Sequence, residues 1–450
     1  MSTQEPYSFW QKNKLIIKAA FIGFLTLVLL IPTFFIMFLI KDRETRRDEV
    51  VHEVSSKWAG AQTITGPFLS VPYYVTIKNN VNEPVLQKRN LYLLPDELSI
   101  DGKISPLIKH RSIFLVPVYN SNLKIAGKFS PLKTDKLPVA VQDLHFDEAV
   151  VCMGITDFKG IGENLQLKWN DSIVGLETGL PEISWLREGI SCPIKLSATS
   201  FTQGTNNFSI NLSLKGSEQL YVTPFGNTSK VHFESDWRNP AFDGKYLPDT
   251  SIINEKGFTA DWKILHFNRT YPQQFTNVND NLVSESAFGM NLLQPVDAYG
   301  QTQRSIKYAV LIIALTFFLY FFLEIFYHNN VHVLQYILIG FALVIFYTLL
   351  LSISEYVAFG QAYLIASAAT IILIGWYSKS IFKKWGIVLL FSFILSLLYV
   401  FIFVLIQLQD NSLLFGSIGL FVLLAIIMYF SRKINWNSEE NYSWPKGKGF

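Results

Sequence analysis

The sequence predicts a multi-pass α-helical membrane protein with a large all-β, sandwich-like domain between its first helix and helices two to six. Charged residues make up only 16% of the 450 positions, whereas typical soluble domains contain about 25%. The apolar residues are gathered in long blocks at the start and in the last third of the chain. Between these blocks lies a long region with the composition of strands and turns, so the chain is predicted to combine two kinds of domain.

The first apolar block runs from Leu15 to Ile40 and contains a single charge, Lys18. A membrane-crossing helix needs about 20 apolar residues, and a cleavable signal peptide has a shorter apolar region of about 7–15 residues. We therefore predict an uncleaved transmembrane signal anchor at 15–40, preceded by a short N-terminal segment at 1–14. Pro32 lies inside the block and is expected to kink the helix.

The segment 41–57 is predicted to continue this helix as an amphipathic stalk. Val50, Val51 and Val54 recur there at helical spacing among charged residues. A stripe of this kind is typical of one buried face on an otherwise solvated helix.

The region 58–305 is predicted to be the β domain. Short runs rich in Val, Ile, Thr, Phe and Tyr are separated by Gly, Pro, Asn and Asp, as in β proteins. Asn122–Phe129 and Phe208–Leu214 alternate apolar and polar residues with the period of half-buried strands. Regular short strands favour a sandwich or barrel, and the length is compatible with either one sandwich or two β subdomains sharing a sheet.

The region 306–431 contains five further apolar blocks and is predicted to be a five-helix transmembrane domain, which makes six spans in all. With six spans both termini, including the tail at 432–450, lie on one side of the membrane. Placing that side in the cytoplasm puts nine Lys and Arg residues inside and six on the outside flanks. This modest excess follows the positive-inside rule and places the β domain outside the cytoplasm.

Composition and motifs exclude several classes of function. A net charge of +3 is too small to indicate nucleic acid as a partner. The sequence contains no common catalytic signature, and its histidines lack the spacing of a metal site, so no catalytic residue, cofactor or metal is predicted. Cys152 and Cys192 are the only cysteines, and a disulfide or two buried thiols are equally compatible with the sequence.

Three polar residues near the ends of the predicted membrane helices are candidate functional residues. Glu324 is surrounded by apolar residues, and ionisable groups inside a span are costly and often functional. The alternative is that Glu324 lies one turn from the helix end and reaches headgroup water. Gln335 is placed to hydrogen-bond a neighbouring helix, and Glu355 is predicted near the opposite membrane face from Glu324.

The stretch 237–271 is the densest mixture of polar and aromatic residues in the β domain. Its candidate functional residues are Trp237, Arg238, Asp243, Asp261 and Arg269. Two of its carboxylates could flank a glycosidic bond, but turn residues such as Asp243-Gly244 are also expected in an ordinary strand–loop segment. Binding of carbohydrate or peptide by aromatic side chains is as compatible with this stretch as catalysis.

Several of these segments resemble the CreD family of bacterial inner membrane proteins, also described as cell envelope integrity proteins. The matching segments span nearly the whole chain and are Trp58–Tyr73 (WAGAQTITGPFLSVPY), Asn239–Pro248 (NPAFDGKYLP), Gly257–Trp262 (GFTADW), Asn268–Gln273 (NRTYPQ), Phe288–Ala309 (FGMNLLQPVDAYGQTQRSIKYA), Gln335–Gly340 (QYILIG) and Phe346–Glu355 (FYTLLLSISE). The family pattern has Pro where this chain has Val333, which puts the start of that helix in doubt.

The resemblance implies an inner membrane protein with cytoplasmic termini and a periplasmic β domain, in agreement with the charge count. It also implies a role in envelope integrity and the envelope-stress response, without any established reaction or ligand. We expect a non-enzymatic protein that binds or scaffolds an envelope partner, with the lipid bilayer as its surroundings. The alternative is a transporter or channel formed by helices two to six, against which stands the apolar middle of the predicted spans.

Overall fold

The computed structural model describes residues 14–78, 83–132, 137–292, 298–327, 329, 331–408 and 412–432. It divides into two compact units, one of residues 1–46 with 296–450 and the other of residues 47–295. The predicted N-terminal segment and most of the predicted tail, 433–450, lie outside the described residues. Each unit is described by itself below.

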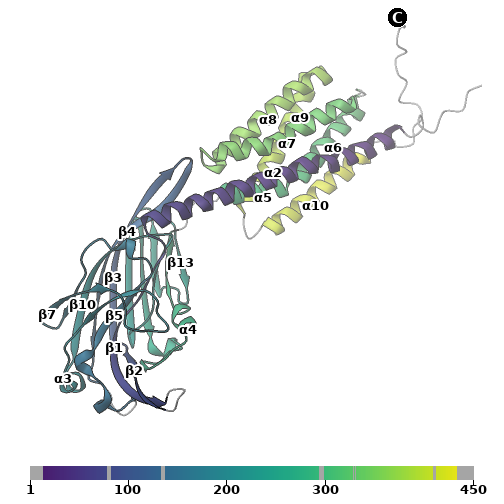
Figure 1. The fold of residues 1–450 in the computed structure, drawn as a ribbon. Coiled ribbons are helices and arrows are strands. Elements are labelled where there is room, and N and C mark those ends of the chain that lie inside the picture. The colour runs from purple at the N-terminus through teal and green to yellow at the C-terminus, as the bar shows by residue number, and fades with distance from the viewer. Residues whose placement is uncertain are drawn as a thin grey trace, which may run out of the picture. The chain divides into compact units, whose positions relative to one another are not determined.

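The first unit is helical (Figure 1). Its described helices are α2 (Lys14–Trp58, of which residues up to 46 belong to this unit), α5 (Ala298–Lys307), α6 (Ala309–Tyr327), α7 (Val333–Ser354), α8 (Phe359–Phe382), α9 (Trp385–Gln407) and α10 (Ser412–Ser431). By length and composition, α2, α6, α7, α8 and α9 are sufficient to cross a membrane. The described apolar stretch of α10, Leu414–Tyr429, is shorter, so the sixth span stays a prediction.

Helix α2 is continuous through both the predicted anchor and the predicted stalk. Pro32 lies inside it without breaking it, and the Thr33 hydroxyl donates to the Leu30 carbonyl at 2.7 Å. Hydroxyl groups of this kind satisfy backbone carbonyls near an intrahelical proline. The helix ends at Trp58, where the first strand follows after three residues.

The second unit is a sandwich of two β sheets (Figure 1). The first sheet contains β1 (Gln62–Lys78), β2 (Pro84–Leu93), β5 (Val150–Ile155), β8 (Glu177–Thr178), β9 (Gly189–Pro193), β11 (Gln219–Val222), β13 (Pro240–Gly244), β16 (Gln274–Phe275) and β17 (Phe288–Leu292). The second contains β3 (Glu97–Arg111), β4 (Phe114–Phe129), β6 (Gln166–Trp169), β7 (Ser172–Gly175), β10 (Asn206–Ser217), β12 (Thr228–Ser235), β14 (Thr250–Asn254) and β15 (Gly257–Leu265). Two short helices, α3 (Ala198–Gln203) and α4 (Asp280–Ser284), lie in the connections.

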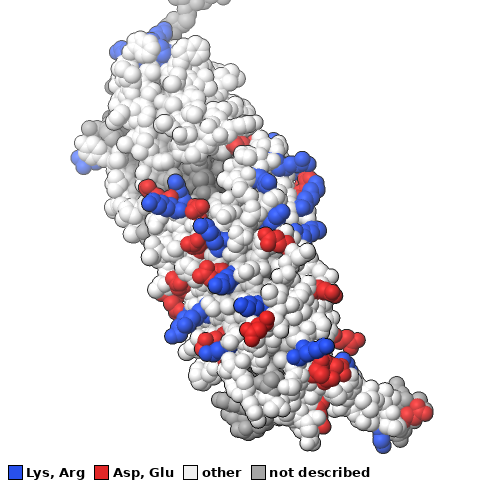
Figure 2. Space-filling view, turned by 90° about the vertical axis from the view of Figure 1, so that its left-hand side faces the viewer, with Lys and Arg blue, Asp and Glu red and all other residues white. Residues whose placement is uncertain are grey.

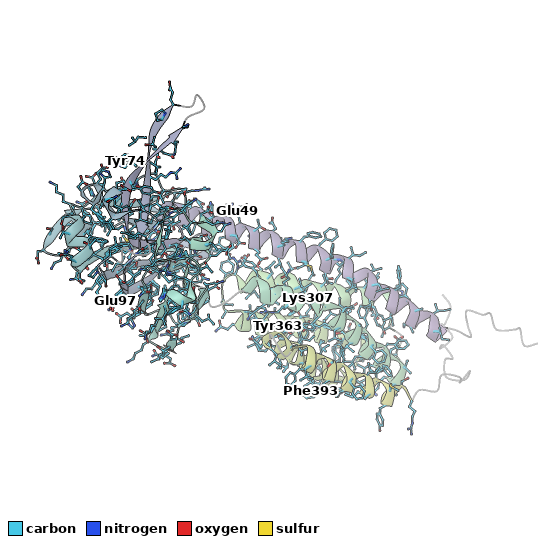
Figure 3. The ribbon with its side chains drawn as sticks, turned by 90° about the horizontal axis from the view of Figure 1, so that it is seen from below. Glu49, Tyr74, Glu97, Lys307, Tyr363 and Phe393 are labelled. Carbon is cyan, nitrogen blue, oxygen red and sulfur yellow. The ribbon has the colours of Figure 1, made fainter. Side chains whose placement is uncertain are left out.

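The path of the first sheet is β13-β17-β11-β1-β5-β9-β8, with β2 pairing β1 and β16 pairing β2. The second runs β14-β15-β12-β3-β4-β10-β6-β7. Most neighbours are antiparallel, but β1 pairs β11 and β12 pairs β3 in parallel. The β1–β2 hairpin projects from the sandwich as an arm, with Tyr74 on its first strand (Figure 3).

Strand alternation predicted from the sequence is confirmed in β4 and β10. These strands pair antiparallel, with Leu212 opposite Leu123 and Ile210 opposite Ile125, and all four side chains are buried. The residues between them alternate outward. In contrast, β1 is buried almost continuously from Ile64 to Tyr73, because a central strand covered on both faces needs apolar residues on both.

The two sheets share one hydrophobic core, so of the two alternatives left open by the sequence the structure shows a single sandwich. Trp262 of the second sheet packs on Phe288 of the first with ring centroids 5.7 Å apart. Phe242 of the first sheet likewise packs on Phe258 of the second at 5.5 Å. Aromatic contacts of this kind, repeated along the interface, fill the space between the sheets.

The two cysteines are both free thiols in the sandwich core. In the β5–β9 pairing Val151 lies opposite Cys192, and Cys152 lies opposite Ser191. Opposite residues share a face while sequential ones alternate, so the two thiols are on opposite faces of the sheet and cannot form a disulfide. Burial raises the pKa of Cys192 to about 11 and the pKa of Cys152 even further above its ordinary value.

One predicted boundary differs from the structure. The β domain was expected to extend to residue 305, but its last strand ends at Leu292, and Ala298–Lys307 forms helix α5 of the helical unit. No long apolar block marks this segment, because α5 is rich in Gln, Ser, Thr, Arg and Lys. The helix is nevertheless amphipathic, since buried Tyr299, Thr302 and Ile306 recur at helical spacing, and it packs against α7 and α9.

Candidate functional site

The carboxylates of Asp243 and Asp261 lie on different sheets and point away from each other. On β13 the side chain before Asp243 is Phe242, which faces the core against Phe258 and Trp262. Because strand side chains alternate, Asp243 faces outward, and it is exposed. Asp261 precedes the buried Trp262 on β15 and faces outward from the second sheet. Packed sheets are about 10 Å apart, so these groups are not placed to flank one glycosidic bond.

Asp243 stabilises the end of its own strand. Its carboxylate accepts hydrogen bonds from the Gly244 backbone N–H at 2.7 Å and from Asn291 Nδ2 at 3.3 Å. The Gly244 N–H and then the Tyr221 hydroxyl lower the pKa of Asp243 below its ordinary value. Gly244 has a φ of +96°, a backbone conformation that favours glycine. The Asp-Gly pair of the family motif therefore has a structural explanation.

Asp261 pairs with His232 across two neighbouring strands. The two residues lie directly opposite each other in the β12–β15 pairing, and His232 Nδ1 is 2.7 Å from Asp261 Oδ1. The Thr250 hydroxyl donates to the other carboxylate oxygen at 3.2 Å. A hydrolytic site would need a nucleophile at the second imidazole nitrogen, and no hydroxyl or thiol of the described residues hydrogen-bonds there.

Arg269 is buried, with a relative exposure of 7%, and its partners are carbonyl oxygens rather than carboxylates. Its guanidinium donates to the Tyr271 and Pro272 carbonyls at 2.8 and 3.0 Å and to the Gln273 side chain. Gln273 in turn donates to the carbonyls of Leu94 and Pro95 at 2.9 and 2.7 Å. Burial lowers the pKa of Arg269. The NRTYPQ segment thus ties this loop to the connection between β2 and β3.

The other two candidates of this stretch do not join Arg269. Trp237 is half-buried against the core, and its indole N–H donates to the Asn239 carbonyl at 2.9 Å. Arg238 is exposed. The five candidates of 237–271 therefore lie in separate environments, and the structure does not bring them to one cleft.

Glu324 lies in a cluster at one end of the helical unit. Its side chain is only 3% exposed and forms an ion pair with Lys18 of α2. It also accepts from the Tyr336 hydroxyl at 3.0 Å and from the Val331 backbone N–H at 3.1 Å. Lys18 donates further to the Val331 carbonyl at 2.7 Å. The carboxylate is therefore satisfied by protein groups instead of reaching headgroup water, which was one of the two interpretations of the sequence.

Glu355 occupies the other end of the same unit. The Tyr299 hydroxyl donates to its carboxylate at 3.2 Å, and Arg43 Nε of α2 lies 3.8 Å from the same oxygen. Lys18 and Arg43 are 25 residues apart on one helix, or roughly 37 Å along its axis. This distance slightly exceeds the hydrocarbon thickness of about 30 Å, so the two ion pairs connect α2 to the later helices at the two ends of its apolar part.

Gln335 caps its own helix instead of bonding a neighbouring one. Its side chain accepts from the His332 backbone N–H at 2.8 Å, while His332 Nδ1 accepts from the Leu334 N–H at 3.2 Å. This reciprocal arrangement is a capping box. Val333 is the first residue of α7, where proline is favoured in other helices, so replacing the family's Pro leaves the start of the helix intact.

The sequence did not predict the polar groups in the interior of the helical unit. Thr316, Tyr347 and Tyr399 are at most 2% exposed, and their hydroxyls have no hydrogen-bond partner among the described residues. They lie seven or eight residues from the same ends of α6, α7 and α9, which is a common depth of roughly 10–12 Å. Because tyrosine is counted among the apolar residues, this layer of hydroxyl groups was not predicted. Tyr363, labelled in Figure 3, donates from within the bundle to the Tyr399 carbonyl at 2.9 Å.

The described residues contain no group of three or more His, Cys, Asp or Glu side chains that could hold a metal ion. In the sandwich, the candidate residues stabilise turns, loops and strand pairs. In the helical unit, Glu324 and Glu355 each join α2 to later helices, and Lys18 and Arg43 are the partners that the sequence did not identify. The signal for Lys18 was its position as the only charge in the first apolar block.

Comparison with known proteins covers almost the whole chain. The model of the family described as "Inner membrane protein CreD" matches residues 14–437. The curated "Inner membrane protein CreD" of Escherichia coli (strain K12) is 29% identical over 439 residues, covering 94% of this chain and 93% of that protein. The matched region includes both the helical unit and the β sandwich, and the chain therefore belongs to the CreD family of inner membrane proteins.

Proposed function

We propose that this protein contributes to envelope integrity and to the response to envelope stress by binding a partner through its periplasmic sandwich. In this proposal the termini are cytoplasmic and the membrane is crossed six times. The excess of Lys and Arg on the flanks assigned to the cytoplasm supports this orientation. Binding is favoured over catalysis because the candidate carboxylates of the sandwich lie apart and each has a structural role.

The observation that carries the proposal is a set of exposed apolar side chains on the edge strand β14, in the segment before it and in the turn after β15. Leu247, Ile252 and Phe267 are 71%, 64% and 83% exposed. Ile252 lies on β14, the terminal strand of that sheet. An edge strand can pair with an extended segment of another chain, and exposed apolar side chains beside it would add contact area.

Complementation of a deletion strain tests this function. The strain is expected to be sensitive to detergent or to cell-wall antibiotics, and the wild-type protein should restore resistance. Ile252→Lys and Phe267→Glu should abolish the restoration, because both place charge in an apolar contact. The matched control is Ile173→Lys, since Ile173 is 66% exposed on β7 at the opposite edge of the same sheet.

Two results would refute the proposal. The first is an envelope that is unchanged in the deletion strain. The second is full complementation by both edge variants, with membrane levels equal to those of the wild type. Loss of function with Ile173→Lys alone would place the contact at the other edge.

A transporter or channel remains the second candidate, and one observation favours it. The hydroxyls of Thr316, Tyr347 and Tyr399 have no hydrogen-bond partner among the described residues, and water or a polar solute could satisfy them. A path through the bilayer would use them, so Tyr347→Phe and Tyr399→Phe should reduce complementation without reducing protein level. Full activity of the double variant would remove the observation that supports this candidate.

A further inference from the structure

Helix α5 presents a polar face to the interior of the helical unit. Tyr299, Thr302, Ser305 and Ile306 are buried there, and the helix packs against α7 and α9. Three of these four buried side chains carry hydroxyl groups, although the surrounding helices are strongly apolar. The Tyr299 hydroxyl donates to Glu355 and the Thr302 hydroxyl to the Ala298 carbonyl, whereas the Ser305 hydroxyl has no partner among the described residues.

Three polar atoms on this helix are buried without a hydrogen-bond partner among the described residues. They are Gln301 Oε1, Arg304 Nε and Ser305 Oγ. The spacing of three and four residues places the three side chains on one side of the helix. Buried polar atoms without partners are rare and costly, and the position of these three on one side of the helix indicates a site that water or a ligand completes.

The charge at this site is positive. Within the described part of the chain no carboxylate pairs with Arg304, and α5 contains no Asp or Glu. Glu355, which α5 reaches through Tyr299, already has Arg43 beside it. An arginine held at the edge of a membrane bundle without an acidic partner is unfavourable, and an anion would offset that cost.

The site lies at the level of lipid headgroups. Helix α6 has 19 residues, which is roughly 28 Å and nearly the thickness of the hydrocarbon. Helix α5 precedes α6 by one residue, so it lies beyond the hydrocarbon at the end of α6. Phosphate groups of lipids are concentrated at this depth.

We propose that Arg304, Ser305 and Gln301 bind a phosphate-bearing group at this end of the helical unit. The planar guanidinium fits two phosphate oxygens at once, and the Ser305 hydroxyl is placed one residue further along to donate to a third. The Gln301 amide can donate to the same group through its nitrogen after rotation of the amide. The source is either an anionic lipid headgroup or free phosphate, and both present the same oxygens.

Thermal unfolding of the full-length protein in lipid nanodiscs tests the proposal. One set of discs contains phosphatidylcholine alone and the other contains one third phosphatidylglycerol, and each is measured with inorganic phosphate or with chloride at equal ionic strength. A ligand bound only by the folded protein raises its stability. We expect the wild-type Tm to rise by several degrees with phosphatidylglycerol, with phosphate, or with both, and the pattern identifies the source.

Arg304→Gln should abolish this rise while leaving the Tm in phosphatidylcholine with chloride unchanged or higher, because it removes a half-buried cation whose Nε has no hydrogen-bond partner among the described residues. Lys307→Gln is the matched control, since it removes the same charge from an exposed position on the same helix. It should keep the full rise. If Arg304→Gln does not fold, Ser305→Ala is measured instead and should lose at least half of the rise.

Five results would overturn the proposal. The wild type could show no rise with either phosphatidylglycerol or phosphate. Arg304→Gln could keep the full rise, or lower the Tm equally under all conditions, which would make Arg304 a structural residue. Lys307→Gln could lose as much as Arg304→Gln, which would indicate general attraction of charges. Full retention of the rise by Ser305→Ala, where that variant is used, would also contradict the proposal.

Discussion

The sandwich and the helical unit distribute polar and apolar side chains in opposite ways. In the sandwich, Trp262 and Phe68 are buried while Asp243 and Asp261 are exposed. In the helical unit, Phe393 is 67% exposed on the outside of α9 (Figure 3), whereas Glu324 is only 3% exposed. On the face shown in Figure 2, charged side chains are spread over the sandwich and the helical part is nearly free of them.

This difference follows from the two solvents. Water around the sandwich makes apolar burial the main stabilising term, whereas lipid around the helices gives no advantage to burying apolar groups. Polar side chains therefore bind helix to helix inside the helical unit. Most charged residues of the sandwich lie on its surface, with the buried Arg269 as an exception, whereas Glu324 in the helical unit joins segments that are distant in the chain.

The largest expected effect is the loss of an aromatic side chain from the sandwich core. Trp262 is 2% exposed and contacts Phe233, Phe242 and Phe288. Trp262→Ala should lower the free energy of unfolding of the sandwich by about 3–5 kcal/mol, measured by denaturant unfolding followed by circular dichroism at strand wavelengths. Phe267→Ala, at an 83% exposed position, is the control and should change it by less than about 0.5 kcal/mol. Equal effects would contradict the assignment of the core.

The ion pair between Lys18 and Glu324 should show an asymmetric response. Lys18→Met leaves a carboxylate that is 3% exposed without its cation, and should destabilise the helical unit by about 3 kcal/mol. Glu324→Gln leaves Lys18, which is 26% exposed and can extend its ammonium toward water, so the expected loss is about 1 kcal/mol. Unfolding of the purified protein in mixed micelles measures both.

A double variant sharpens this prediction. Lys18→Met combined with Glu324→Met removes both charges and should recover most of the stability lost in Lys18→Met, because no uncompensated charge is left. A double variant that is less stable than Lys18→Met alone would show that the pair is not the main interaction of these residues.

The second ion pair of α2 should matter less. Arg43 is 46% exposed and lies 3.8 Å from the Glu355 carboxylate, so its interaction is weakened by water. Glu355→Gln should cost at most about 1 kcal/mol, since the amide oxygen can still accept from the Tyr299 hydroxyl. If Glu355→Gln lost more stability than Lys18→Met in the same micelles, the pair of Arg43 and Glu355 would be the stronger of the two. That result would contradict this prediction.

The smallest effect is expected at Asp243 and depends on pH. Its pKa is lowered in the folded protein by the Gly244 N–H and the Tyr221 hydroxyl. The carboxylate therefore contributes stability that is fully present above the unfolded pKa of about 3.9 and is lost as the pH falls through the lower folded pKa. Asp243→Asn should be slightly less stable than the wild type at pH 7 and equal to it in strong acid. An equal difference at both pH values, measured by urea unfolding, would contradict this explanation.

Local patterns in the sequence predicted the elements well. The block from Leu15 to Ile40 gave the membrane part of α2, and the alternation in Phe208–Leu214 gave β10 and the face that it buries. Both patterns extend over neighbouring residues, within one or two helical turns or a few strand positions. They therefore predict an element without knowledge of the element that packs against it. Helix α5 was not predicted, because its apolar stripe is short and most of its residues are polar.

The division into an apolar helical unit and a β domain can be predicted from local patterns, since hydrophobic periodicity depends on neighbouring residues. Which residues come into contact is set by the packing of the whole chain. Lys18 and Glu324 are 306 residues apart in the chain. Asp243 and Asp261 are only 18 residues apart, but they belong to opposite sheets. Contacts of this kind depend on how the whole chain packs, because the sheet order and helix register that create them are set by the sum of many distant interactions.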